Sequence, residues 1–142
     1  MPVHPDGYFG RMQSGAVPRP AVSALLGGVI RAVDVEAGTL ASDYAGRPEF
    51  FNPAGQVQGG ILCAMLDDVT AMLVTATVGP GEACATLNLN VSFHKPGQVG
   101  PILGKSRLVW RGRDICNVTG ELWQDDKLIA TASATCMIAR PR

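Results

Sequence analysis

A stretch of eighteen residues that is apolar on nearly every side, residues 61–78, follows two consecutive glycines. Only Asp67, Asp68 and three threonines interrupt it. A helix that is apolar all round has to be surrounded by other parts of the protein rather than laid on a surface. Gly79-Pro80-Gly81 ends the stretch, because proline cannot continue a helix. The sequence therefore predicts one central buried helix.

The same stretch is long enough to suggest a membrane span. Two adjacent aspartates near its middle would each cost about 2.5 to 3.5 kcal/mol in a bilayer, and its content of Leu, Ile and Val is modest. We therefore interpret it as a core helix that carries carboxylates into a protein interior. An ionised group there needs a partner, nearby water or a shifted pKa, so Asp67 and Asp68 are the first candidates for chemistry.

The length and composition set limits on the rest of the chain. The 142 residues, 46% of them hydrophobic, are enough for one domain with one compact core. Twelve basic and twelve acidic residues cancel, so we expect neither nucleic acid nor a membrane as a partner. The four cysteines lack metal-ligand spacing, and no secretory signal precedes them. These features predict reduced thiols, no metal and a cytoplasmic location.

Shorter elements are expected before the helix. Residues 1–20 are rich in proline and glycine, which predicts a loose N-terminal arm or a strap over the surface, with a single domain at 21–142. A short helix is expected at 21–26. Two strands at 29–35 and 39–45, with turn residues between them, predict a hairpin.

After the helix, the period of the sequence changes to two. Apolar and largely polar residues alternate from Ala83 to Phe93, which predicts a strand with Leu87 on its apolar face and Thr86 on its polar face. Runs at 105–113, 115–123 and 127–138 predict a meander of further antiparallel strands. Wrapping this sheet around the helix is the simplest way to bury the helix, so the expected class is α+β.

The residues before the helix resemble a family motif. Asn52-Pro53-Ala54-Gly55-Gln56-Val57-Gln58-Gly59-Gly60, with Asp67 seven residues later, is similar to the N-x-x-G-x-x-H-G-G signature and following acid of the hot-dog-fold acyl-CoA thioesterases of the phenylacetate-pathway (PaaI-like) type. The pattern of helix and strands from residue 40 to 138 matches this family too. The resemblance implies a hot-dog fold, in which an antiparallel sheet wraps around one long helix.

The resemblance also implies an activity. It suggests hydrolysis of an acyl-CoA thioester to a free acid and coenzyme A, with no cofactor apart from the coenzyme A of the substrate. The site residues that it implies are Asp67, Gly59, Gly60, Asn52, Gln58 and Thr86. Asp67 would be the general base or nucleophile, and Thr86 would stand beside the attacking water. Gln58 replaces the family's histidine, and because it cannot carry a proton we expect it to orient the site beside Asn52.

Thioester hydrolysis gives this spacing a physical reason. Free N–H groups and the positive end of the dipole at Gly59 and Gly60 can polarise a carbonyl. Asp67 lies on nearly the same helix face but about 10 Å further along the axis, whereas both groups should be about 3 Å from the reacting atoms. We therefore predict a homodimer, or a tetramer of two dimers, in which Asp67 of one chain meets the helix N-terminus of its partner. Asp68 points about 100° away, so it is the weaker catalytic candidate and is interpreted as a hydrogen-bonded or partly solvated helix acid.

Two further alternatives concern the ligand. Four basic residues of the run at 105–113 are expected on one face, where they either bind the phosphates of coenzyme A or are simply solvated: Lys105, Arg107, Arg111 and Arg113. The second candidate function is a non-catalytic acyl-CoA or acyl-chain binding module on the same fold, with Gln58 as the mark of lost chemistry. No G-x-S-x-G motif is present, so a serine hydrolase is not expected.

Overall fold

The computed structural model of the chain describes residues 2–141. Its elements follow in the order α1 (Tyr8–Gln13), α2 (Ala21–Leu25), β1 (Val29–Asp34), β2 (Thr39–Gly46), the 3-10 helix η1 (Pro48–Phe50), α3 (Gly59–Ala76), β3 (Ala83–Phe93), β4 (Gly100–Arg111), β5 (Ile115–Gln124) and β6 (Lys127–Ala139). The sequence predicted the six strands, α2 and α3 to within a few residues, except that β4 begins five residues earlier. It did not predict α1.

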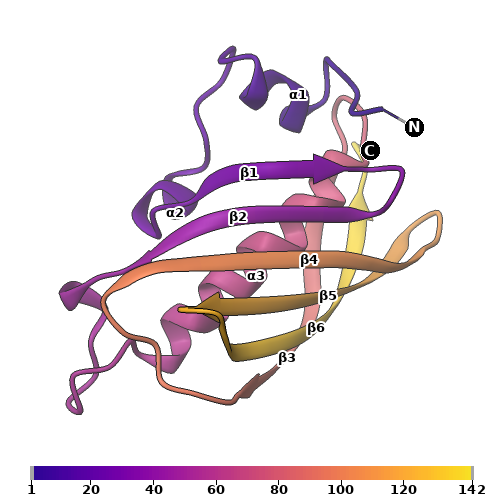
Figure 1. Cartoon of the computed structure of the whole chain (residues 1–142). Coiled ribbons are helices and arrows are strands. Elements are labelled where there is room, and N and C mark those ends of the chain that lie inside the picture. Colours follow the sequence, from indigo (N-terminus) through magenta and orange to yellow (C-terminus); the bar gives the residue numbers. More distant parts are fainter. Residues whose placement is uncertain (1, 142) are drawn as a thin grey trace.

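The six strands form one antiparallel sheet in the order β1-β2-β4-β5-β6-β3. The sheet curves around α3, which contacts every strand from β2 to β6 (Figure 1). The predicted α+β hot-dog architecture is therefore confirmed. By length and composition α3 would also pass as a membrane span, but its apolar side chains form the core of this domain.

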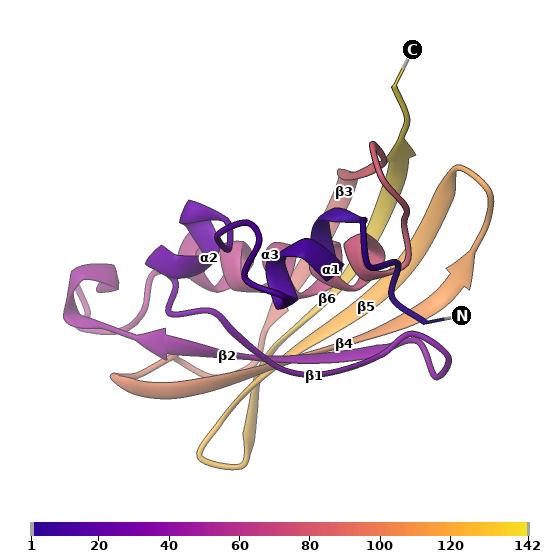
Figure 2. The same cartoon turned by 90° about the horizontal axis from the view of Figure 1, so that it is seen from above.

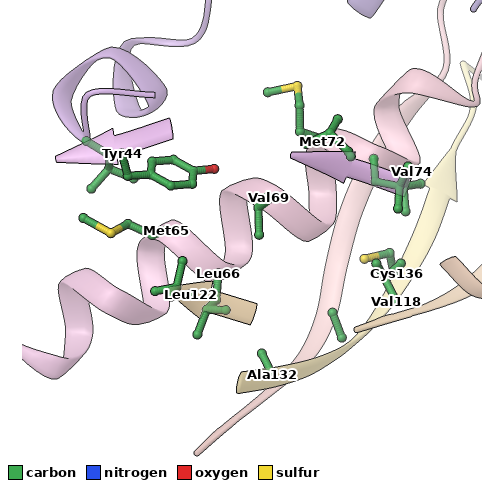
Figure 3. Close-up of a cluster of buried hydrophobic side chains, with 14 of the residues drawn as sticks. Tyr44, Met65, Leu66, Val69, Met72, Val74, Val118, Leu122, Ala132 and Cys136 are labelled. Carbon is green, nitrogen blue, oxygen red and sulfur yellow. The ribbon is translucent and has the colours of Figure 1, made fainter. Parts of the chain in front are cut away.

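The core lies between α3 and the concave face of the sheet. Figure 3 shows part of it, with Met65, Leu66 and Val69 of α3 among side chains from β2, β5 and β6. Two glycines let the helix and sheet approach closely. A Cβ at Gly104 of β4 would lie 3.4 Å from Val69 of α3 and 2.7 Å from the Tyr44 ring of β2, and one at Gly120 of β5 would lie 3.0 Å from the methyl group of Thr70 of α3. The central helix is thus held at a fixed depth over the sheet.

Residues 2–20, here called the N-terminal strap, are not a loose arm. Their helix α1 packs against α3 and buries Phe9 to 1% exposure. The Tyr8 hydroxyl donates to the Pro18 carbonyl, and the Arg19 guanidinium donates to the Gly28 carbonyl. Figure 2 shows α1 and α2 beside α3 on the same side of the sheet. The buried Phe9 side chain and these hydrogen bonds hold the segment in place, so the expectation of looseness is wrong and the strap alternative describes it.

A β-bulge at Leu87 changes the predicted faces of β3. Thr86 pairs with Cys136 of β6, but the next pair is Asn88 with Thr135, so Leu87 has no partner and is 56% exposed. Before the bulge, Thr86 lies on the same side as the buried Cys136; after it, the odd-numbered residues pack against the core. Because a bulge shifts the alternation by one residue, the assignment of Leu87 to an apolar face and Thr86 to a polar face is wrong.

A second bulge, between Leu108 and Trp110, divides the basic residues of β4. Lys105 and Arg107 lie on the outer face, where Arg107 pairs with the exposed Thr119. Arg111 instead pairs with the buried Cys116, and its Nε donates to the Thr77 hydroxyl at 3.3 Å. Arg113 lies in the following turn beside Asp114. The prediction that all four share one face is therefore wrong, again because an extra residue reverses the alternation.

Candidate functional site

The loop before α3 is organised by Asn52. Its side-chain oxygen accepts hydrogen bonds from the backbone N–H groups of Ala54 (3.0 Å) and Gln56 (3.2 Å). Gly55 has φ +75°, a conformation that a glycine adopts without strain. Gln58 is anchored through its backbone N–H, which donates to the Phe50 carbonyl at 2.8 Å, and its side chain is exposed. Within residues 2–141 no hydrogen bond joins the side chains of Asn52 and Gln58. Asn52 therefore fixes the conformation of the loop before α3 and does not bind the Gln58 side chain.

The first turn of α3 offers unpaired backbone donors. Ile61 and Leu62 donate to the Gln58 carbonyl, whereas the N–H groups of Gly59 and Gly60 have no acceptor in the described part of the chain. A Cβ at Gly59 would lie 3.2 Å from the Phe93 ring, so this glycine makes room for the aromatic side chain. Nothing lies within 4 Å of a Cβ at Gly60. The open side of the helix N-terminus is therefore at Gly60.

Asp67 and Thr86 meet at the middle of α3. The Thr86 hydroxyl donates to Asp67 Oδ1 at 2.7 Å, and both side chains are partly buried. The bulge at Leu87 allows this contact, because it turns Thr86 toward the helix while Leu89 still packs on the core. Asp67 forms no other side-chain hydrogen bond or ion pair within the described residues, so its carboxylate retains acceptor positions for a further group.

Asp68 is held differently. It accepts hydrogen bonds from the Ser23 hydroxyl of α2 at 2.5 Å and from the Tyr44 hydroxyl of β2 at 2.6 Å. Burial raises the pKa of Tyr44 far above its usual range, and the neighbouring Asp68 charge raises this pKa further. Tyr44 therefore remains a neutral donor. The prediction that Asp68 is a hydrogen-bonded helix acid is confirmed, and its lesser importance for catalysis stays a prediction.

Three cysteines cluster near Asp67, which the sequence did not indicate. Cys116 pairs directly with Cys136 across β5 and β6, and Cys84 approaches Cys136 from β3. This contact and burial raise the pKa of Cys84, and the charge of Asp67 adds a smaller effect. The thiol therefore stays protonated and is a poor nucleophile. The register of three strands brings these residues together, and no local motif marks it.

Residues 2–141 contain no group of three or more His, Cys, Asp or Glu that could hold a metal ion.

Comparison with models of protein families shows the family of this chain. The model of the thioesterase superfamily matches residues 54–131, which include the loop at Asn52 from Ala54 onward, all of α3, and Thr86. The chain belongs to the thioesterase superfamily. The comparison with curated proteins gave no match.

Solved structures extend the match to most of this thioesterase-superfamily chain. A phenylacetic acid degradation-related protein from Ralstonia eutropha JMP134 is 65% identical, with a TM-score of 0.90, over 92% of this chain and 98% of that one. The PaaI-like resemblance is thus confirmed. A thioesterase from Haemophilus influenzae (16% identity, TM-score 0.78, 86% and 85% coverage) and a mutant thioesterase from Pseudomonas aeruginosa (21%, 0.79, 89% and 91%) share the fold.

The candidate site of this thioesterase-superfamily chain is divided along α3. Gly60 and Asp67 both belong to the helix, so seven residues and about 10 Å of axis separate the free N–H groups from the carboxylate. A single thioester group does not span this distance, since its carbonyl oxygen and reacting carbon are bonded neighbours. Within one chain, the structure brings Asp67 to Thr86 but not to Gly59 or Gly60.

Proposed function

We propose that the protein hydrolyses acyl-CoA thioesters, with Asp67 as the general base or nucleophile. The observation that carries this proposal is the hydrogen bond from Thr86 to Asp67 in the middle of an otherwise apolar helix. It fixes a carboxylate that has free acceptor positions and no cation partner among the described residues. A carboxylate in this setting can accept a proton from water or attack a carbonyl carbon itself.

The chemistry follows two alternative routes. In the first, Asp67 takes a proton from a water molecule, the water oxygen adds to the thioester carbonyl carbon, and the carbon–sulfur bond then breaks to release the coenzyme A thiolate. In the second, Asp67 adds to that carbon itself, the carbon–sulfur bond breaks to release the coenzyme A thiolate, and water hydrolyses the resulting anhydride to the free acid and the Asp67 carboxylate. Thr86 orients the carboxylate in both routes. The products are a free acid and coenzyme A.

The carbonyl oxygen needs donors where its negative charge develops. The unpaired N–H groups at Gly59 and Gly60, together with the positive end of the α3 dipole, supply this environment. Since they lie about 10 Å from Asp67 of the same chain, we propose that they act with Asp67 of a second chain in a homodimer. In support, β3 carries Thr86 and is an edge strand of the sheet, with Leu87 and Phe93 exposed on it.

The oligomer can be tested without substrate. Light scattering at micromolar concentration should show a dimer, or a tetramer of two dimers. A stable and active monomer would contradict the shared site.

Coenzyme A also needs a place for its phosphates. Of the four basic residues expected to bind them, Lys105 and Arg107 remain together, in a shallow hollow of about 390 Å³ on the outer face of the sheet. Arg111 donates to Thr77 and to the Gly112 carbonyl, and Arg113 lies beside Asp114. We therefore retain Lys105 and Arg107 as the proposed phosphate ligands.

A cytoplasmic location is proposed too, and the four free thiols support it.

The test is a panel of acyl-CoA substrates, assayed with a thiol reagent that reports released coenzyme A. The panel includes arylacetyl-CoA thioesters, because a 65% identical relative is a phenylacetic acid degradation-related protein. We expect turnover of at least one class. The second candidate, a non-catalytic binding module, is favoured by the replacement of the family's histidine with Gln58. Binding of acyl-CoA in calorimetry without release of coenzyme A would support that candidate and contradict hydrolysis.

A further inference from the structure

A cavity of about 240 Å³ lies along α3, where Asp68, Ala71, Met72 and Thr75 line it on the helix side. Ala71 and Thr75 follow Asp67 at intervals of four residues on one face of α3, and both line the cavity. Cys84 also lines it, two residues before Thr86 on β3, and is close enough to Asp67 for that charge to affect its pKa. An acyl chain attached to a carbonyl carbon at Asp67 would therefore have this cavity about one helix turn away.

The N-terminal strap and α2 form one wall of the cavity. Tyr8 and Pro20 of the strap and Val22 of α2 form this wall. The wall is fixed by the burial of Phe9 against the core and by the hydrogen bond from Arg19 to the Gly28 carbonyl. The segment expected to be loose is thus a built part of the cavity.

The lining favours uncharged, apolar groups. The Thr75 hydroxyl donates to the Ala71 carbonyl at 2.8 Å, so it is already used by the helix. The raised pKa keeps the Cys84 thiol neutral. The charged residues at the edges are two carboxylates, Asp68 and Glu82. Hydroxyl groups satisfy Asp68, while the Gly79 N–H and Arg140 satisfy Glu82. A ligand with its own carboxylate would meet like charges there.

We propose that this cavity receives the acyl group, that the N-terminal strap limits the length of that group, and that the substrates are compact, uncharged acyl-CoA thioesters. The inference rests on the proposed thioester hydrolysis at Asp67. The size of the cavity fits compact acyl groups. An apolar cavity of about 150 Å³ in another protein holds benzene, so a cavity of about 240 Å³ takes a phenyl-sized group or a short aliphatic chain.

A second cavity of about 350 Å³ lies beyond the first. The two share Pro20, Asp68 and Met72 in their linings, and the second extends to Met12 and Ile30. Met72 is almost fully buried between them. Its side chain therefore separates a short acyl site from a space that a longer chain would fill.

The experiment measures kcat/KM for straight-chain acyl-CoAs of increasing length, for benzoyl-CoA, and for a thioester whose acyl chain ends in a carboxylate. In the wild type, we expect the carboxylate-terminated substrate to be at least about tenfold poorer than the neutral substrate of equal length. Val22→Trp narrows the cavity and should lower the long-to-short ratio of kcat/KM by about tenfold. Met72→Ala should raise this ratio by a similar factor. Val109→Trp, on the exposed bulge of β4, is the matched control and should leave the ratio as it is.

The outcomes separate the assignment of the acyl cavity from the proposed thioester hydrolysis at Asp67. Hydrolysis with unchanged length profiles in both Val22→Trp and Met72→Ala, each checked for folding by thermal denaturation, would overturn the cavity assignment and leave the thioesterase function standing. Equal activity on carboxylate-terminated and neutral chains would do the same. Hydrolysis of no acyl-CoA at all would overturn both.

Discussion

The two neighbouring aspartates of α3 lie in contrasting surroundings. Asp67 receives one hydrogen bond, from Thr86 of β3. Asp68 receives two short hydrogen bonds, from Ser23 and Tyr44, which tie α3 to α2 and β2. One residue of helix turns a side chain by about 100°, which is enough to separate a carboxylate available for chemistry from one that joins three elements. The number of donors already committed to a carboxylate distinguishes the two roles.

The largest expected effect comes from removing the charge of Asp67. Asp67→Asn keeps the size of the side chain, so folding and acyl-CoA binding should survive, while kcat should fall by about 10² to 10⁴, as expected for losing a general base. Asp68→Asn, assayed beside it with folding checked for both, should lose only a few-fold. Equal and small effects from the two variants would remove the distinction between the aspartates.

Thr86→Ala should have the next largest effect. Asp67 would keep its charge but lose the single hydrogen bond that orients it, so we expect kcat to fall by about tenfold, less than for Asp67→Asn. Thr86→Ser retains the hydroxyl and should recover most of the rate. If Thr86→Ser were as slow as Thr86→Ala, the effect would come from packing of the methyl group on β3 rather than from the hydrogen bond.

The partly buried hydrogen bond between Tyr44 and Asp68 can be tested by measuring stability at alkaline pH. Burial raises the pKa of Tyr44 in the folded protein above its unfolded value of 10.0. The unfolded chain therefore loses this proton first as pH rises, and stability should fall by about 1.4 kcal/mol per pH unit above pH 10. Tyr44→Phe, which removes the group, should show a shallower loss in urea unfolding across this range. Identical slopes in the two proteins would contradict the raised pKa.

Much of this arrangement could be predicted from the sequence. The apolar stretch indicated α3, the change to period two indicated the strands, and the motif placed Asp67 and Thr86 at one site. Elements fixed by a few isolated residues could not be predicted. The strap is held by Phe9 and by two hydrogen bonds, without any periodicity, and Ser23 reaches Asp68 from a five-residue helix. The composition of the strand does not reveal the bulge at Leu87. The one extra residue nevertheless reverses which side chains of β3 face the core.

A smaller effect is expected at Gln58, on the other part of the proposed site. Its backbone is anchored and its side chain is exposed, so Gln58→Ala should weaken turnover only moderately, by a few-fold, and Gln58→His should be tolerated. The measurement is kcat and KM for both variants. Unchanged turnover in Gln58→Ala would mean that this loop acts through its backbone alone.

The most direct test of the shared site is complementation between two inactive variants. Asp67→Asn lacks the acid. Gly60→Leu places a bulky side chain at the helix N-terminus, where a Cβ has no atom of its own chain within 4 Å. Mixed dimers made by unfolding and refolding the two proteins together would contain one site with wild-type Asp67 and a wild-type partner Gly60. We predict that the refolded mixture recovers about one quarter of wild-type activity, since about half of the dimers are mixed and each has one intact site. No recovery, with mixed dimers demonstrated by mass spectrometry, would contradict a site built from two chains.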